Sequence, residues 1–245
     1  MSLILRLMFF CAYTVHIVTS KPYMISSLFD INEIAFTLAG YPLSYVELIG
    51  TIFGMASVWF STQQSILTWP AGIINIIFFI ALFFQVQLYS DVILQFYYFG
   101  MSIYGWINWK KQFQRQQSIV VLKNKERIRM GVFILFATIV SGFIMTQIHL
   151  WLPSLFSKPA AFPFLDSAIA VMSIMAMVLM AKRVLENWVL WLFVNILCVY
   201  VYAAKHILFT SFEYALFFIL ALIGFYQWQR SLHQQKKENT DVLSF

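Results

Sequence analysis

Charged side chains are scarce in this chain of 245 residues. Asp, Glu, Lys and Arg together make up 11% of it, whereas hydrophobic residues make up 61%. A soluble domain needs a polar surface around its core, and this composition is too poor in charge to supply one. The shortage excludes a soluble globular protein and favours a chain that lies mostly within a lipid bilayer.

Cysteine, proline and glycine are also few. The two cysteines, Cys11 and Cys198, both fall in apolar stretches, so no disulfide framework is indicated. Six prolines and nine glycines leave few breaks in the apolar segments. We therefore predict an all-α integral membrane protein.

Charge is missing above all from the middle of the apolar segments. No Asp, Glu, Lys, Arg or His of the sequence falls near the expected midplane of a bilayer, where proton relays and cation-coupled pumps carry such residues. The sequence also has no phosphate-binding loop, metal-ligand spacing or nucleophile–base arrangement. We expect uncoupled passage of a substrate, and neither an enzyme nor a cofactor or metal site.

What the sequence contains instead is a series of long apolar runs. A helix needs roughly 20 residues to cross the hydrocarbon core. We predict eight transmembrane helices, over residues 3–19, 43–61, 67–87, 90–109, 130–152, 164–181, 187–204 and 207–228. The first is interpreted as a retained helix, because no small-residue cleavage site follows it.

The basic residues predict the orientation of these spans. Seven of the 16 Lys and Arg residues fall in the loop 110–129, which places that loop in the cytoplasm. Alternation of the spans then puts both termini in the cytoplasm and leaves only Lys21, Lys158 and Lys205 outside. The net charge of +6 thus reflects the positive-inside pattern, and a nucleic-acid partner is not expected.

One segment of the chain occurs twice. Residues 42–111 and 161–230 align without a gap at an offset of 119, so that Trp69 matches Trp188 and Gly105 matches Gly224. Four spans lie within that offset, so both copies have one orientation, as the parallel repeats of transporters do. We predict an extra helix and a 3+1+3 core, divided into an N-terminal helix with its outer loop (1–40), a first three-helix repeat (41–111), a basic loop (112–129), a linking helix (130–158), a second repeat (159–231) and a tail (232–245).

Polar and aromatic residues mark the second helix of each repeat. Trp188, Trp191 and Asn195 share one face of the span 187–204 by their i, i+3, i+7 spacing. Two aromatic faces and an amide suit a flat heteroaromatic ring. The alternative is a pair of interfacial tryptophans, with Asn195 bonded to a neighbouring helix. Trp69 and Asn75 in the span 67–87 lie about 120° apart around the helix, so Asn75 is a weaker member of that face.

A second polar stripe lies in the span 90–109. Gln95, Tyr98 and Ser102 again have i, i+3, i+7 spacing, and we predict that they line a substrate path rather than a packing interface. Their equivalents in the second copy include Tyr214 and Phe217, so we expect the span 207–228 to have lost its polar face.

Several of these motifs resemble one known family. The combination resembles the PnuC-type nicotinamide riboside transporters over about residues 41–230. The matching elements are Glu186-Asn187-Trp188-x-x-Trp191-x-x-x-Asn195, Leu88-Tyr89 through Gln95 to Tyr104-Gly105-Trp106-x-x-Trp109, Gly224-x-x-x-Trp228 and Tyr41-Pro42-Leu43-Ser44.

The resemblance implies a bacterial inner-membrane protein with a SWEET-like fold. It implies facilitated diffusion of nicotinamide riboside, with net uptake driven by a cytoplasmic riboside kinase, and a homotrimer. Carried onto this sequence, the substrate-binding residues are Trp188, Trp191, Asn195, Gln95, Tyr98, Asn75 and Trp69. Tryptophan is the best cation–π partner for a pyridinium ring, worth ~2 kcal/mol when desolvated, whereas a phosphorylated mononucleotide would need Arg or Lys at the site.

Other substrates remain open at this point. Relatives on the same scaffold resemble thiamine and riboflavin transporters, and thiamine is also a cationic heteroaromatic. The complete Trp-x-x-Trp-x-x-x-Asn element favours the riboside. A sugar carrier is a further alternative, because Trp and Asn also bind pyranose rings.

Overall fold

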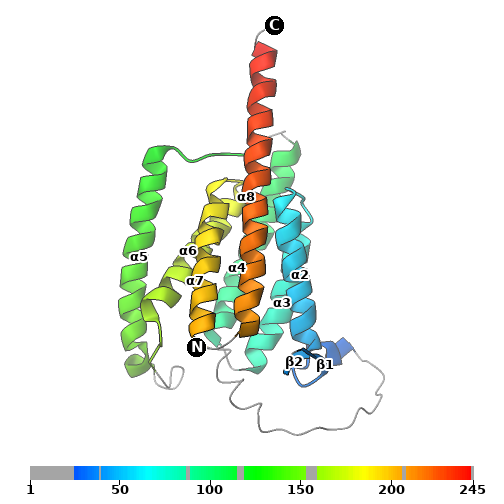
Figure 1. Ribbon diagram of the computed structural model, residues 1–245, viewed down its shortest axis with the longest axis vertical. Coiled ribbons are helices and arrows are strands. Elements are labelled where there is room, and N and C mark those ends of the chain that lie inside the picture. Colours follow the sequence, from blue (N-terminus) through cyan, green and yellow to red (C-terminus); the bar gives the residue numbers. More distant parts are fainter. Residues whose placement is uncertain are drawn as a thin grey trace.

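The computed structural model describes residues 25–38, 40–86, 89–114, 119–152, 159–205 and 208–243. This part of the chain forms seven α-helices, a short 3-10 helix and a two-stranded sheet (Figure 1). The predicted span 3–19 lies outside the described residues. The elements in chain order are η1 (Ile25–Phe29), β1 (Ile34–Leu38), β2 (Tyr41–Ser44), α2 (Tyr45–Thr62), α3 (Thr68–Gln85), α4 (Tyr89–Gln114), α5 (Asn124–Trp151), α6 (Pro163–Ala181), α7 (Glu186–Ala204) and α8 (Leu208–Leu243).

Each of the other seven predicted spans coincides with one of these helices. Five helices are long and apolar enough to cross a membrane, namely α3, α5, α6, α7 and the part of α8 between Thr210 and Gln235. α2 and α4 are at least as long as α3 but contain more polar side chains, such as Glu47 in α2 and Gln95 in α4. The all-helical membrane fold is confirmed in this coarse form.

A β-hairpin precedes α2, which the sequence analysis did not anticipate. β1 and β2 pair antiparallel, with Phe36 opposite Leu43, and Gly40 has a φ of 84° in the turn. A residue without a side chain adopts this left-handed conformation without steric cost. Residues 41–44, assigned to the first repeat, are therefore strand rather than helix. Ser44 then caps α2, its Oγ accepting a hydrogen bond from Glu47 N at 3.4 Å.

Six of the helices form a closed ring. Neighbouring helices pack together within α2–α3–α4 and within α6–α7–α8, and α2 packs on α8 while α4 packs on α6. α5 packs on α6 outside the ring and stands apart from the other helices (Figure 1). We call the end of the bundle with β1 and β2 the hairpin end. The opposite end, where α8 projects, is called the basic end because it bears Lys110, Lys111, Lys182 and Arg183.

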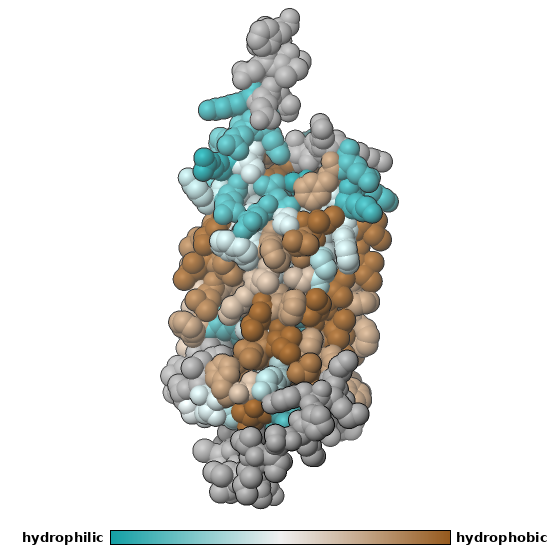
Figure 2. All heavy atoms as spheres, turned by 90° about the vertical axis from the view of Figure 1, so that its right-hand side faces the viewer, coloured by the Kyte–Doolittle hydropathy of each residue, from teal (hydrophilic) through white to brown (hydrophobic). Residues whose placement is uncertain are grey.

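The outer surface of the bundle carries a hydrophobic band. Figure 2 shows apolar side chains over the middle of the molecule and hydrophilic ones at the basic end. On α5 the exposed large hydrophobic residues are Ile128, Val132, Phe133, Leu135, Phe136, Ile139, Val140, Phe143, Ile144, Leu150 and Trp151. Apolar side chains exposed around the whole bundle are expected when lipid rather than water surrounds the protein.

Candidate functional site

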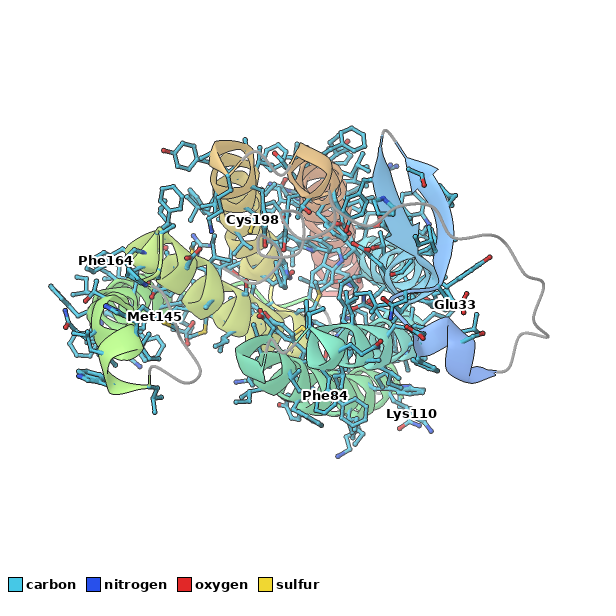
Figure 3. All side chains as sticks on the ribbon, turned by 90° about the horizontal axis from the view of Figure 1, so that it is seen from below. Glu33, Phe84, Lys110, Met145, Phe164 and Cys198 are labelled. Atoms are coloured by element: carbon cyan, nitrogen blue, oxygen red, sulfur yellow. The ribbon has the colours of Figure 1, made fainter. Side chains whose placement is uncertain are left out.

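Two stripes of side chains run along α4 and α7 on their inward sides. Tyr98 and Cys198 interact across the ring, which shows that these sides face each other. Figure 3, seen from the hairpin end, shows Cys198 on the side of α7 turned toward the other helices, whereas Phe84 and Lys110 point outward. The stripe on α4 contains Gln95, Tyr98, Ser102, Gly105 and Trp109, and that on α7 contains Trp188, Trp191, Asn195, Cys198 and Tyr202.

Trp69 and Trp188, both predicted to bind substrate, lie where the stripes reach the basic end. The ring of Trp188 packs over Gly224, where an added Cβ would lie 2.5 Å from Cη2, and the ring of Trp69 packs in the same way over Gly105. The two side chains are 1% and 2% exposed. Neither indole N–H has an acceptor among the described residues. Their rings here fill the space between helices that the two glycines leave.

Asn75 joins two helices of the first repeat. Its Nδ2 donates a hydrogen bond to Gly50 O at 2.7 Å and lies 2.9 Å from where a Cβ on Gly54 would be. The amide thus holds α3 against α2 at a close approach. This contact is of the kind that polar side chains make between membrane helices.

Trp191 and Asn195 continue the α7 stripe toward the hairpin end. Trp191 is half-buried and packs against two apolar clusters, one that spans both repeats and one within the second repeat. Asn195 is only 5% exposed and its side chain forms no hydrogen bond within the part of the chain that the structure describes, but its amide is not among the fully buried atoms without a partner and so stays accessible. An amide that is accessible but unpaired inside the ring offers its donors and its acceptor to a water or a ligand group.

Gln95 and Tyr98 occupy the corresponding level of α4. The Tyr98 hydroxyl interacts with Ser173 on α6, and Ser102 on the same stripe is 1% exposed. Gln95 is half-buried, and no described residue bonds to its amide. Gln95 aligns with Tyr214 in the second repeat, and Tyr214 lies in the interior of the ring. The structure thus brings Gln95, Tyr98 and Asn195 to the inward sides of α4 and α7.

Two tyrosines near these residues were missed by the sequence analysis. Tyr202 on α7 and Tyr214 on α8 stack with ring centroids 5.3 Å apart and planes only 9° from parallel. Tyr214 also interacts with Cys198 and Tyr98, so we call Tyr98, Cys198, Tyr202 and Tyr214 the tyrosine group. The expectation that α8 had lost its polar face was therefore wrong at Tyr214. The signal was available, because Tyr202 follows Asn195 by seven residues and shares its face.

The charges nearest this group lie toward the hairpin end. Lys205 Nζ is 3.8 Å from Asp166 Oδ1 and 5.4 Å from the centre of the Phe162 ring. Asp91, Asp166 and Lys205 all act electrostatically on members of the tyrosine group. Among the described residues, Lys205 is the only cation that does so, and it is already paired with a carboxylate.

Glu186, the first residue of the motif that carries the family resemblance, has a different environment. It is 8% exposed and accepts hydrogen bonds from Leu122 N at 3.2 Å and from Arg127 Nε at 2.8 Å. Val120 beside it pairs with the turn between α6 and α7 through Arg183 O. This carboxylate holds the basic loop and the start of α5 on the second repeat. It is not part of the tyrosine group.

Comparison with known proteins agrees with this architecture. The family model described as nicotinamide mononucleotide transporter matches residues 44–230. The nicotinamide riboside transporter PnuC of Escherichia coli (strain K12) is 32% identical over 214 residues, covering 80% of this chain and 90% of that protein. The riboflavin/roseoflavin transporter RibM of Streptomyces davaonensis is 23% identical over 203 residues, covering 81% and 91%. The crystal structure of the vitamin B3 transporter PnuC matches with a TM-score of 0.56 at 20% identity, covering 78% of this chain and 83% of that one.

Proposed function

The chain belongs to the nicotinamide mononucleotide transporter family, and from this premise we propose that it carries nicotinamide riboside across a membrane by facilitated diffusion. The family and these relatives are transporters, not enzymes. Nicotinamide riboside has a cationic pyridinium ring, a neutral carboxamide and a ribose. A site for it needs aromatic faces, amide groups and hydroxyls, and no strong fixed charge at the ring.

The buried Asn195 amide is the observation that carries this proposal. It has no partner among the described residues, and it lies about two helical turns from Tyr202 on the same face of α7, whose ring stacks on Tyr214 of α8. Asn195 and Gln95 together offer donors and acceptors that match a carboxamide. Tyrosine faces attract a pyridinium ring, and the hydroxyl of Tyr98 suits a ribose oxygen.

The predicted binding residues divide into two groups in this proposal. Asn195, Gln95, Tyr98 and Trp191 contact the substrate, joined by Tyr202 and Tyr214. The assignment of Trp188, Trp69 and Asn75 as binding residues stays a prediction from the resemblance, and their present contacts support a role in holding the helices around the site.

The orientation in the membrane rests on the positive-inside pattern. We propose that the basic end faces the cytoplasm of a bacterial inner membrane, with both termini on that side, and that eight spans form the predicted helix plus 3+1+3 core. Its division at residues 41, 112, 130, 159 and 232 stays a prediction. Trapping by a cytoplasmic riboside kinase and assembly into a homotrimer are likewise proposals from the resemblance.

The binding site is tested by calorimetric titration of the purified protein with nicotinamide riboside. Asn195→Ala is expected to weaken binding on the order of 10-fold or more, because it removes the hydrogen bonds to the carboxamide. Gln147→Ala serves as the matched control, since it removes an exposed amide on α5 outside the ring. Equal affinities of Asn195→Ala and the unaltered protein would place the substrate elsewhere.

The riboside should be preferred over the mononucleotide, although the family description names the latter. A phosphate needs unpaired Arg or Lys donors, and the cation described near the tyrosine group, Lys205, is paired with Asp166. We expect unlabelled riboside to compete with labelled riboside in proteoliposomes and the mononucleotide to compete weakly. Competition of similar strength by the two compounds would contradict this prediction.

A riboflavin transporter is the second candidate, because RibM aligns with 81% of the chain. The other alternative substrates are thiamine, which is also a cationic heteroaromatic, and glucose. Titration with riboflavin, thiamine and glucose separates these from the riboside. If only riboflavin or thiamine gives a binding signal, the protein is still a transporter but its substrate is that vitamin and not nicotinamide riboside.

A further inference from the structure

The two repeats are joined at the basic end by one contact that occurs twice. Trp109 Nε1 donates a hydrogen bond to Met180 O at 3.0 Å, and Trp228 Nε1 donates one to Ser61 O at 2.9 Å. Trp109 is equivalent to Trp228, and Ser61 to Met180, under the repeat offset. Each repeat therefore donates an indole N–H hydrogen bond to the other repeat. The accepting carbonyl lies in the last turn of the first helix of that other repeat.

Equivalent residues also contact each other between these two bonds. Ser61 Oγ donates a hydrogen bond to Met180 Sδ at 2.9 Å, and Arg183 Nη2 donates one to Gln64 Oε1 at 2.7 Å. Gln64 and Arg183 have positive φ angles of 57° and 55°, so the two turns share an unusual backbone as well. A residue can touch its own equivalent only close to the axis that relates the repeats. The contact therefore lies on that axis.

Four tryptophan rings fill the space around this axis, and we call them the tryptophan plug. Trp109 packs edge-to-face on Trp69 at 5.3 Å, Trp228 packs edge-to-face on Trp188 at 5.7 Å, and Trp109 and Trp228 lie 5.9 Å apart. All four rings are at most 2% exposed. The guanidinium of Arg183 covers Trp109 at 5.6 Å, and burial lowers the pKa of this group. Close-packed rings at the axis leave no passage there.

The tryptophan plug lies between the proposed binding site and the basic end. The α7 stripe leads from Asn195 to Trp188 in seven residues, about 10 Å along the helix, and the α4 stripe leads from Tyr98 to Trp109 in about 16 Å. Nearer the hairpin end, the two repeats are joined by a bond that occurs only once. Tyr97 OH donates a hydrogen bond to Ile174 O at 3.0 Å. The equivalent residues there are Leu216 and Met55, which line an apolar groove of about 390 Å³ instead.

We propose that the tryptophan plug is the cytoplasmic gate of the transporter, and that substrate leaves when Trp109 and Trp228 release the carbonyls of Met180 and Ser61. The gate rests on the proposed transport function and orientation. Alternating access between parallel repeats requires separation at one end at a time. Reciprocal bonds on the axis make the two halves of this gate break together, because a rotation that lengthens one lengthens the other.

A reversible cross-link across the axis tests the gate. The double variant Ser61→Cys with Met180→Cys is treated with a short bis-methanethiosulfonate reagent in proteoliposomes. We expect riboside transport to fall at least 10-fold while riboside binding persists, and a reductant to restore transport. The two single variants, which keep Cys11 and Cys198, control for other thiols. Transport at an unchanged rate after cross-linking would overturn the proposal.

A second measurement needs no substrate and therefore separates failure of the gate from failure of the proposed function. Trp109→Phe and Trp228→Phe keep the rings and remove one donor each. In the Ser61→Cys background, each is expected to raise the rate of alkylation of Cys at 61 from the basic side by roughly 2- to 10-fold. Trp151→Phe, an exposed residue of α5, is the matched control. Equal rates in all variants would contradict the gate even if riboside is carried.

Discussion

Gly105→Ala is expected to destabilise the protein by about 3 kcal/mol, the upper end of the usual cost of overpacking a close-packed core. The new Cβ would overlap the six-membered ring of Trp69, whose neighbours Trp109 and Gly105 leave it no room to move. Gly224→Ala should have the same effect, because its Cβ would lie 2.5 Å from Trp188 Cη2. The apparent melting temperature in detergent should fall by roughly 10 °C, measured by thermal shift of the monodisperse peak in size-exclusion chromatography.

Gly100 provides the matched control for this prediction on the same helix. A Cβ there has nothing within 4 Å, so Gly100→Ala should be neutral or stabilise α4 by up to about 1 kcal/mol through helix propensity. Gly131→Ala on α5 is a second control of the same kind. If Gly105→Ala and Gly100→Ala melt alike, the tryptophan rings are free to move and the plug is not close-packed.

Glu186→Ala is expected to release the basic loop from the second repeat. The variant leaves Leu122 N and the Arg127 side chain without their acceptor, at a cost of about 1–3 kcal/mol for the loop contact. Trypsin cleavage at Lys123, Lys125 or Arg127 should then accelerate on the order of 10-fold, because local opening precedes cleavage. The measurement is the rate of loss of intact chain in inside-out vesicles.

Two further variants separate the loop contact from general destabilisation. Glu126→Ala removes an exposed carboxylate that accepts only from Lys123 N within the described loop, at 2.8 Å, and should change cleavage little. Glu186→Gln keeps one oxygen acceptor and should lie between Glu186→Ala and the unaltered protein. If Glu186→Ala, Glu186→Gln and the unaltered protein are cleaved at the same rate, Glu186 does not hold the loop.

This anchoring also bears on which repeat moves. The α6–α7 turn is tied to the basic loop through Val120, which bonds Arg183 O and accepts from Leu185 N. The equivalent α2–α3 turn has no such strand beside it within the described residues, and its Leu67 is 50% exposed. We therefore expect the first repeat to move and the second to stay with α5 during opening.

The sequence by itself determined the features that depend on neighbours along the chain. Apolar runs of membrane length predict α3, α5, α6 and α7, because a helix in lipid must satisfy its own backbone. The spacing of Gln95 with Tyr98 and of Trp191 with Asn195 placed each pair on one helix face, since that follows from 3.6 residues per turn. The repeat offset also predicted that Trp69 and Trp188 have equivalent places.

What those faces contact was decided only by the tertiary structure. Periodicity shows that Trp188 and Asn195 share a face, but not that the ring of Trp188 lies on Gly224 while the Asn195 amide has no partner among the described residues. The stacking of Tyr202 on Tyr214 and the binding of Glu186 to the basic loop likewise join residues from separate helices. Such contacts depend on how helices pack across the ring, and packing geometry is not encoded in the spacing along any one helix.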